Sequence, residues 1–182
     1  MAKLISSDSC MIWWSGPSVR ESINKLPKFK TEIGCNHIET YRPVDTVVAY
    51  DRPIVTQLNK QGLTPGVGYY TQSVWSTTGW RHIPHIDKHY NQIHCSGTLA
   101  VEVAIRLGHT NLLVAGADWD NTNDSLQQAH YEFRGHKPNK MPERKRAWLV
   151  RVSTRCSITW VHPKPKAWMA EHITPDQLLN QL

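Results

Sequence analysis

The hydrophobic pattern of the chain is clearest in residues 95–118, where an apolar helix is followed directly by an apolar strand. Leu99, Val103 and Leu107 recur at four-residue spacing, which predicts a helix with one buried face. Gly108 follows at the position where a left-handed helix cap favours glycine. The pattern therefore predicts a helix that ends at a glycine cap, immediately before the next strand.

A run of apolar residues at 112–115 predicts that strand, and its lack of polar alternation indicates cover on both faces. Helix-start signals separate the apolar runs: Ser18 and Glu21 form a Ser-x-x-Glu capping box, and Pro53 and Pro142 fit first helical turns. Strands that alternate with helices predict an α/β fold, a mainly parallel sheet flanked by helices, in one domain over 1–182. The other predicted strands are 10–14, 29–35, 44–50, 67–71 and 157–162, and the other predicted helices are 18–26, 53–59, 142–154 and 174–179.

Polar residues follow four of the predicted strands. They are Ser15 and Ser18 after the first strand, Asn36 after the second, Asp51 after the third, and Asp118 after the strand at 112–115. Open α/β sheets bind ligands outside the carboxyl ends of their strands. We therefore expect a ligand site where these side chains converge.

Basic residues are concentrated in the last third of the chain, although the whole protein carries a net charge of only +6. Residues 134–166 contain ten Lys and Arg against one acidic residue, whereas the rest of the chain has 11 basic and 14 acidic residues. Such a local excess favours an anionic ligand, such as a nucleotide phosphate, an acidic sugar or nucleic acid. A solvated basic helix is the plain alternative.

The cysteines and the hydropathy indicate the compartment. Four widely spaced cysteines form no Cys-x-x-Cys pair, so we expect reduced, mostly buried thiols. No apolar run is long enough for a transmembrane helix, and the first residues contain no apolar signal core. We expect a cytoplasmic protein, and the sequence leaves homo-oligomerisation open.

Residues 72–94 show little periodicity, and a long irregular stretch in a small domain is often functional. His82, His85 and His89 have a spacing that could share a metal ion, but Pro84 argues against the helix that would align them. A packed, aromatic loop near the ligand site is the favoured interpretation, and we expect no metal. Trp75, Trp80 and Trp119 could stack a sugar or a base there.

Six segments resemble, in order, motifs of the bacterial Campylobacter-type sialyltransferases. The resemblance spans about residues 11–166, and its helix and Gly-x-Asp strand are shared with the 6-hydroxymethylpterin diphosphokinase-like proteins. The matching segments are Ser15-Gly16-Pro17-Ser18, Gly34-Cys35-Asn36, Tyr50-Asp51-Arg52-Pro53, Cys95-Ser96-Gly97 through Leu107-Gly108, Gly116-Ala117-Asp118-Trp119, and His130 through His136.

The resemblance implies a Rossmann-like sheet and an inverting, metal-independent transfer from a nucleotide-activated acidic sugar, CMP-sialic acid in that family, to a hydroxyl-bearing acceptor. No further cofactor is required. It places Gly16 and Ser18 in the nucleotide-binding turn and Asn36 and Asp51 against the nucleotide or sugar. Ser96 and the Gly97 amide would hold the donor's acid group.

The resemblance also implies a general base, His136, which would deprotonate the acceptor hydroxyl as the glycosidic bond breaks. An unperturbed histidine pKa of about 6.5 suits that role near neutral pH. Charge that develops on the leaving phosphate needs nearby donors and cations, for which Tyr131 and Arg134, or Lys137, are candidates.

Three positions depart from the family pattern and keep other functions open. Ser15 and Asp51 stand where that family has asparagine, and Trp119 stands where it has tyrosine. A diphosphokinase-like enzyme would instead use Asp51 and Asp118 to hold Mg²⁺ between phosphates. A non-catalytic protein would bind nucleic acid through the basic helix at 144–146, with a steep salt dependence.

Overall fold

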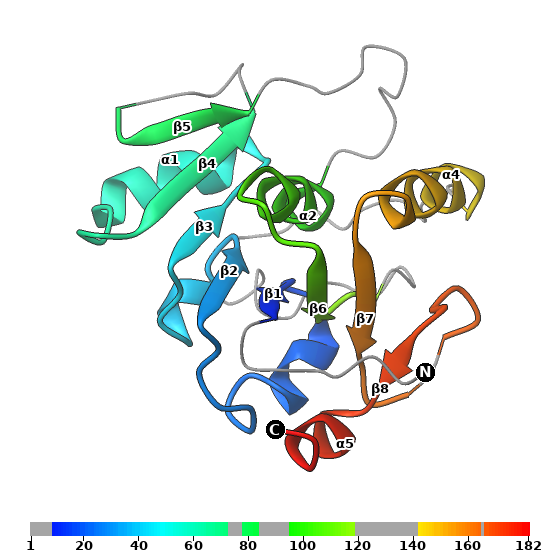
Figure 1. Cartoon of the computed structure of the whole chain (residues 1–182). Helices are drawn as coiled ribbons and strands as arrows, with labels where there is room; N and C mark the ends of the chain where they lie inside the picture. The colour runs from blue at the N-terminus through cyan, green and yellow to red at the C-terminus, as the bar shows by residue number, and fades with distance from the viewer. Residues whose placement is uncertain (1–8, 73–77, 84–94, 119–141, 165) are drawn as a thin grey trace.

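The computed structural model contains one sheet of eight parallel strands, in the order β5-β4-β3-β2-β1-β6-β7-β8 (Figure 1). It describes residues 9–72, 78–83, 95–118, 142–164 and 166–182, with the side chains of 142–147 left undescribed. The strands are β1 (Cys10–Trp13), β2 (Thr31–Cys35), β3 (Thr46–Val48), β4 (Gly68–Gln72), β5 (Trp80–Ile83), β6 (Asn111–Ala115), β7 (Ser157–Val161) and β8 (His172–Ile173).

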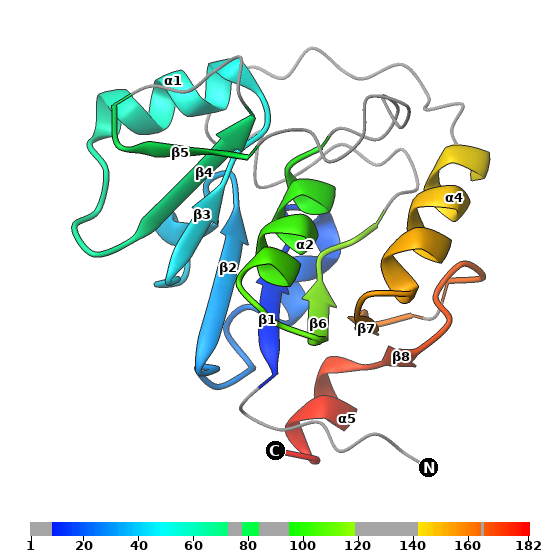
Figure 2. The same cartoon turned by 45° about the horizontal axis from the view of Figure 1, so that its top comes forward.

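Helices cover both faces of this sheet. Alternate residues of β1 show the division: Met11 and Trp13 pack among the residues of one core, and Cys10 and Ile12 among those of the other. Figure 2 shows α2 and α4 in front of the strands, on the second of these faces. The helices are α1 (Arg52–Gln61), α2 (Ser96–Arg106), α4 (Pro142–Ser153) and α5 (Pro175–Leu179), with short 3₁₀ helices η1 (Pro17–Glu21) and η2 (Ile38–Thr40).

These elements confirm the predicted α/β class and correct several boundaries. The six predicted strands are all present, but those at 29–35 and 44–50 are shorter than predicted. Two further strands, β5 and β8, were missed: β5 falls in the stretch that was predicted to be irregular, and β8 has only two residues. Each lies at an edge of the sheet, where one neighbour suffices and the apolar signal is weak.

The buried face of α2 agrees with the prediction only in part. Val103 is buried as predicted, and so are Ala100 and Ala104, whereas Leu107 is 47% exposed and lies beyond the end of the helix. Helix α2 lies against β1, β2 and β3, so its small residues face the sheet and allow a close approach. Gly108 has a φ of +91°, as the predicted glycine cap requires.

The predicted helix at 18–26 is instead the short 3₁₀ helix η1, which begins after Gly16. The Ser18 side chain does not cap it, because the Ser18 hydroxyl donates to Asp118 on a different part of the chain. A long-range contact has therefore replaced the expected local capping box. By contrast, the Thr174 side chain caps α5 as predicted.

All four cysteines are free thiols, and Cys10, Cys35 and Cys156 are buried. None of the helices in the described ranges has the length and apolarity that a membrane crossing requires.

Burial raises the pKa of the Cys10 thiol from 9.0 to about 12, with smaller contributions from the Asp45 and Glu32 carboxylates. The folded state therefore keeps a proton that the unfolded chain releases, so this contribution to stability is complete below pH 9 and is lost between about pH 9 and pH 12. We expect the urea midpoint to fall across that window, and to fall less steeply in Cys10→Ala. Equal pH slopes for the two proteins would contradict the assignment to Cys10.

Candidate functional site

The order of the strands along the sheet reverses at β1. From β1 the chain proceeds outward through β2 to β5 on one side and returns through β6 to β8 on the other. In open α/β sheets, ligands bind at the carboxyl ends of the strands beside such a reversal. The residues that follow β1, β2, β3, β6 and β7 meet at this edge and form two hydrogen-bonded groups.

The first group joins the ends of β1, β2 and β3 to the start of α2. The Ser96 hydroxyl donates to Asn36 Oδ1 over 2.6 Å and accepts from the Tyr50 backbone N–H over 2.9 Å. Asn36 Nδ2 donates to Ser15 Oγ over 3.1 Å. Asn36 is buried and has a φ of +57°, a left-handed conformation that asparagine tolerates better than most residues. The prediction that Asn36 and Ser96 lie at one edge of the sheet is confirmed by their direct contact.

The direction of every hydrogen bond in this group is fixed by its chemistry. A backbone N–H can only donate, so the Ser96 oxygen accepts from Tyr50 and its own hydrogen turns to Asn36 Oδ1. That contact orients the Asn36 amide, whose Nδ2 then donates to Ser15. In the described part of the chain, the Ser15 hydroxyl hydrogen has no recorded acceptor. The group therefore ends in one donor at the partly exposed Ser15.

The second group lies on the other side of β1 and is centred on Asp118. Its Oδ2 accepts from both the backbone N–H and the hydroxyl of Ser18, at 3.0 and 2.9 Å. Its Oδ1 lies 3.1 Å from Nε2 of His162, which follows β7 and is 4% exposed. Asp118 thus connects the turn after β1 to the end of β7, and both of its oxygens are engaged.

Two glycines allow the backbone to come this close. A Cβ at Gly16 would lie 2.3 Å from both Asp118 Oδ2 and the Gly116 carbonyl oxygen, and one at Gly97 would lie 2.4 Å from the Trp14 indole. The resemblance places both glycines in a binding site, which stays a prediction. The structure shows that each packs closely against its neighbours at the carboxyl edge of the sheet.

Asp51 occupies a different position from the other predicted residues. It is exposed at the start of α1, in the N-cap position, with no side-chain capping bond. Burial raises the pKa of the neighbouring Tyr50 phenol above its ordinary value, and the Asp51 carboxylate raises it further. Gln72, the last residue of β4, donates to the Tyr50 carbonyl over 3.2 Å and was not predicted as a site residue.

The predicted catalytic residues His136, Tyr131 and Arg134 lie outside the described residues, as do Lys137, His85, His89, Trp75 and Trp119. Their roles stay predictions. His82 is exposed on β5, whereas Trp80 is buried and donates to Asn59 Oδ1, so it is not a stacking surface. Among the described residues, no three His, Cys, Asp or Glu side chains come close enough together to hold a metal ion.

His162 was predicted only to end a strand. His162 nevertheless shares the sequence feature that identified Asp118, because each is a polar residue at the carboxyl end of a buried strand. Its pairing with Asp118 could not be seen in the sequence, because the neighbour of β7 was unknown.

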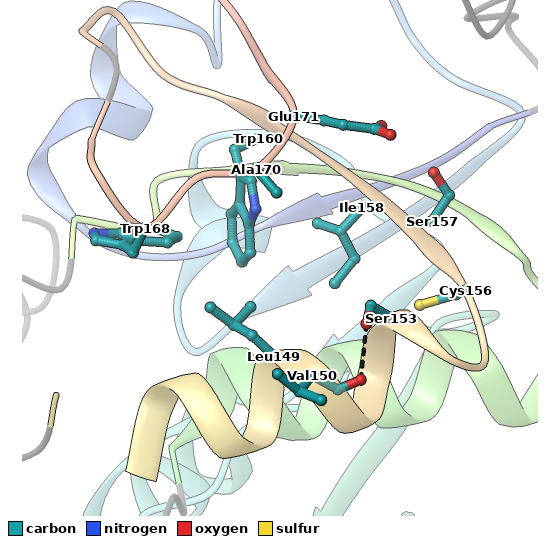
Figure 3. Close-up of a pocket in the computed structure, with 10 residues that line it drawn as sticks. All are labelled: Leu149, Val150, Ser153, Cys156, Ser157, Ile158, Trp160, Trp168, Ala170 and Glu171. Carbon is teal, nitrogen blue, oxygen red and sulfur yellow. Dashed lines mark hydrogen bonds between the residues drawn. The ribbon is translucent and has the colours of Figure 1, made fainter. Parts of the chain in front are cut away.

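A groove of about 480 Å³ lies elsewhere, between α4 and the segment that connects β7 to β8 (Figure 3). Leu149, Ile158, Trp160 and Trp168 form its apolar walls, and Glu171 lies at one end. The Trp160 and Trp168 rings meet edge to face with centroids 4.8 Å apart, and Trp160 also contacts Trp14 at 5.9 Å. The contacts between the three indoles thus connect this groove to Trp14, against which Gly97 packs.

The parallel sheet, the helices on both faces and the reversal at β1 define a Rossmann-like α/β fold. No protein-family model matches the chain, and no curated protein matches it in sequence. Among solved structures, the chain is similar to the MAf glycosyltransferase from Magnetospirillum magneticum AMB-1, with a TM-score of 0.56 and 12% identity. The match covers 100% of this chain and 37% of that protein, and at this identity it shows a shared fold.

Proposed function

We propose that the protein is a glycosyltransferase that binds a nucleotide-activated sugar at the carboxyl edge of its sheet. The observation that carries the proposal is the convergence of the Ser15–Asn36–Ser96 group and the Ser18–Asp118 group on the two sides of β1. The shared fold with a glycosyltransferase supports the same reaction class.

The polar groups at this edge suit an anionic or hydroxyl-rich ligand. Ser15 offers a hydroxyl donor, and the first turn of α2, which contains Gly97, carries the backbone N–H groups at the positive end of the helix dipole. Exposed Asp51 is suited to accept from a ribose hydroxyl rather than to face a phosphate. These groups support a nucleotide sugar, and the basic excess of residues 134–166 favours an acidic sugar of the sialic acid type.

The state of Asp118 supports transfer without a metal. A magnesium ion bound between phosphates requires carboxylate oxygens that are free to coordinate it. Both oxygens of Asp118 already accept or face hydrogen-bond donors from Ser18 and His162. The diphosphokinase-like alternative would therefore have to break this group first. In the proposed reaction, inversion at the sugar carbon would follow deprotonation of the acceptor by His136, with Tyr131 and Arg134 near the leaving phosphate.

A thermal-shift panel tests the proposal. CMP, CDP, UDP, GDP, ADP and their sugars are added with and without Mg²⁺. A ligand at a hundredfold excess over its Kd stabilises the folded state by about 2.7 kcal/mol, which raises the Tm of a chain of this size by roughly 5–10 °C. We expect a nucleotide sugar to give the largest shift without Mg²⁺. A shift that requires Mg²⁺ would favour the diphosphokinase-like alternative, and no shift with any compound would overturn the nucleotide-binding proposal.

Asn36→Gly provides a matched test of the site, because glycine retains the left-handed backbone while removing the amide. We expect the ligand-induced shift to shrink by at least half, since Ser15 and Ser96 lose the group that orients them. Asn180→Ala, at the exposed end of α5, serves as the control and should keep the full shift. An unchanged shift in Asn36→Gly would place the ligand elsewhere.

A further inference from the structure

Hydrogen bonds to neighbouring residues hold the turn after β7 in place. The His162 backbone N–H donates to the Ile173 carbonyl over 3.1 Å, and the His162 carbonyl lies 2.7 Å from His172 Nε2. Pro163 follows and fixes its own φ. The path of the chain from β7 to Lys164 is therefore set by contacts with β8 on one side and Asp118 on the other.

The hydrogen bonds also fix the tautomer of His162. The Lys164 backbone N–H donates to Nδ1 over 3.0 Å, so Nδ1 carries a lone pair and Nε2 carries the hydrogen. Nε2 then donates to Asp118 Oδ1, and Asp118 Oδ2 accepts from Ser18. A continuous connection runs from Lys164 through the imidazole and the carboxylate to the turn after β1.

Lys164 is the cation at the end of this connection. It is exposed, and it forms no ion pair within the ranges that the structure describes. The nearest carboxylate along the connection, that of Asp118, is occupied by Ser18 and His162. The Lys164 backbone is thus held at the end of β7, at the same edge of the sheet as the Ser18 turn, and its exposed side chain can reach an anion bound there.

We propose that His162, Pro163 and Lys164 form a phosphate-binding subsite, in which the Lys164 ammonium binds a phosphate of the nucleotide donor and His162 is the positioning residue. The subsite rests on the proposed function, because it requires that a nucleotide bind at this edge. A lysine beside the leaving phosphate also stabilises the negative charge that develops there as the sugar departs.

Comparing a nucleotide with its nucleoside isolates the phosphate contribution. CMP and cytidine are titrated into the wild type, Lys164→Met, Lys164→Arg and the control Lys60→Met by isothermal titration calorimetry, with UDP, GDP and ADP and their nucleosides in parallel. Lys60 is an exposed lysine in the last turn of α1. We expect Lys164→Met to weaken nucleotide binding about tenfold, as for a lost hydrogen bond between charged groups, and to leave nucleoside binding unchanged. Lys164→Arg should restore most of the affinity.

The positioning role of His162 is tested by non-additivity. We expect His162→Ala, measured at a temperature where circular dichroism shows it folded, to weaken nucleotide binding as Lys164→Met does. The double variant should then bind no more weakly than His162→Ala alone. Additive losses would show that His162 acts on nucleotide binding independently of Lys164 and would overturn its positioning role.

The outcomes separate this inference from the proposed function. If the wild type binds none of the nucleotides, the proposed function and the subsite both fail. If the wild type binds a nucleotide and Lys164→Met binds it equally well, the nucleotide site stands and the Lys164 subsite is overturned.

Discussion

Arg42→Met is expected to lower the free energy of unfolding by about 3–5 kcal/mol, because it removes the guanidinium that pairs with the buried carboxylate of Glu32. Glu32 is 0% exposed, and its oxygens accept from Arg42 Nε at 2.7 Å and from a second guanidinium nitrogen at 2.8 Å. The same guanidinium donates to the carbonyls of Ile23 and Leu26 and lies over the Trp13 ring. The loss is measured by urea unfolding at pH 7.

Lys28→Met is the matched control for this experiment. The Lys28 ammonium lies 3.8 Å from Glu32 Oε2, but its side chain is 50% exposed, so solvent screens the pair. We expect it to cost less than about 1 kcal/mol. If Arg42→Met and Lys28→Met lowered the free energy of unfolding by similar amounts, Arg42 would not be the residue that stabilises the buried charge of Glu32.

Gly116→Ala is expected to lower the free energy of unfolding by about 3 kcal/mol, from backbone strain of about 1–2 kcal/mol and an overpacking cost of similar size. Gly116 has a φ of +78°, and a Cβ there would lie 2.4 Å from the Trp14 carbonyl oxygen and 2.9 Å from Val19 Cβ. Because Gly116 directly follows β6 and lies two residues before Asp118, the variant should also lose the nucleotide-dependent thermal shift.

Gly108→Ala separates the two causes, since Gly108 also has a positive φ, +91°, but has open space where a Cβ would lie. It should show the strain alone, about 1–2 kcal/mol, and keep the ligand response. Equal losses in the two variants would argue that the contact with Trp14 relaxes without cost.

Strands with strong apolar runs were predicted correctly from the sequence, because a parallel strand covered on both faces has few alternatives. β6 and the glycine cap before it are the clearest cases. The edge strands were missed because β5 has two adjacent exposed polar residues between its buried ends, which breaks the alternation, and β8 has only two residues. The buried face of α2 was predicted correctly at Val103 but not at Leu107, because the pattern could not show that alanines face the closely packed sheet.

The candidate site was predictable as a set of positions but not as a set of contacts. The rule that polar residues follow strand ends identified Asn36 and Asp118, and the family resemblance added Ser96, but their hydrogen bonds depend on which strands are neighbours. The same rule applied to His162 would have included it. The local capping signal of Ser18 was misleading because Asp118, 100 residues away in sequence, competes for the same hydroxyl.

That long separation also bears on how the protein assembles. β1 pairs with β2 nearby in the chain and with β6 only after the intervening helices and strands have been made. Contacts between distant segments form slowly, because the chain loses the entropy of closing a long loop before these contacts stabilise it. The two halves of the carboxyl-edge site therefore come together late in folding, and a nascent chain that has not yet reached β6 has only the Asn36 half of it.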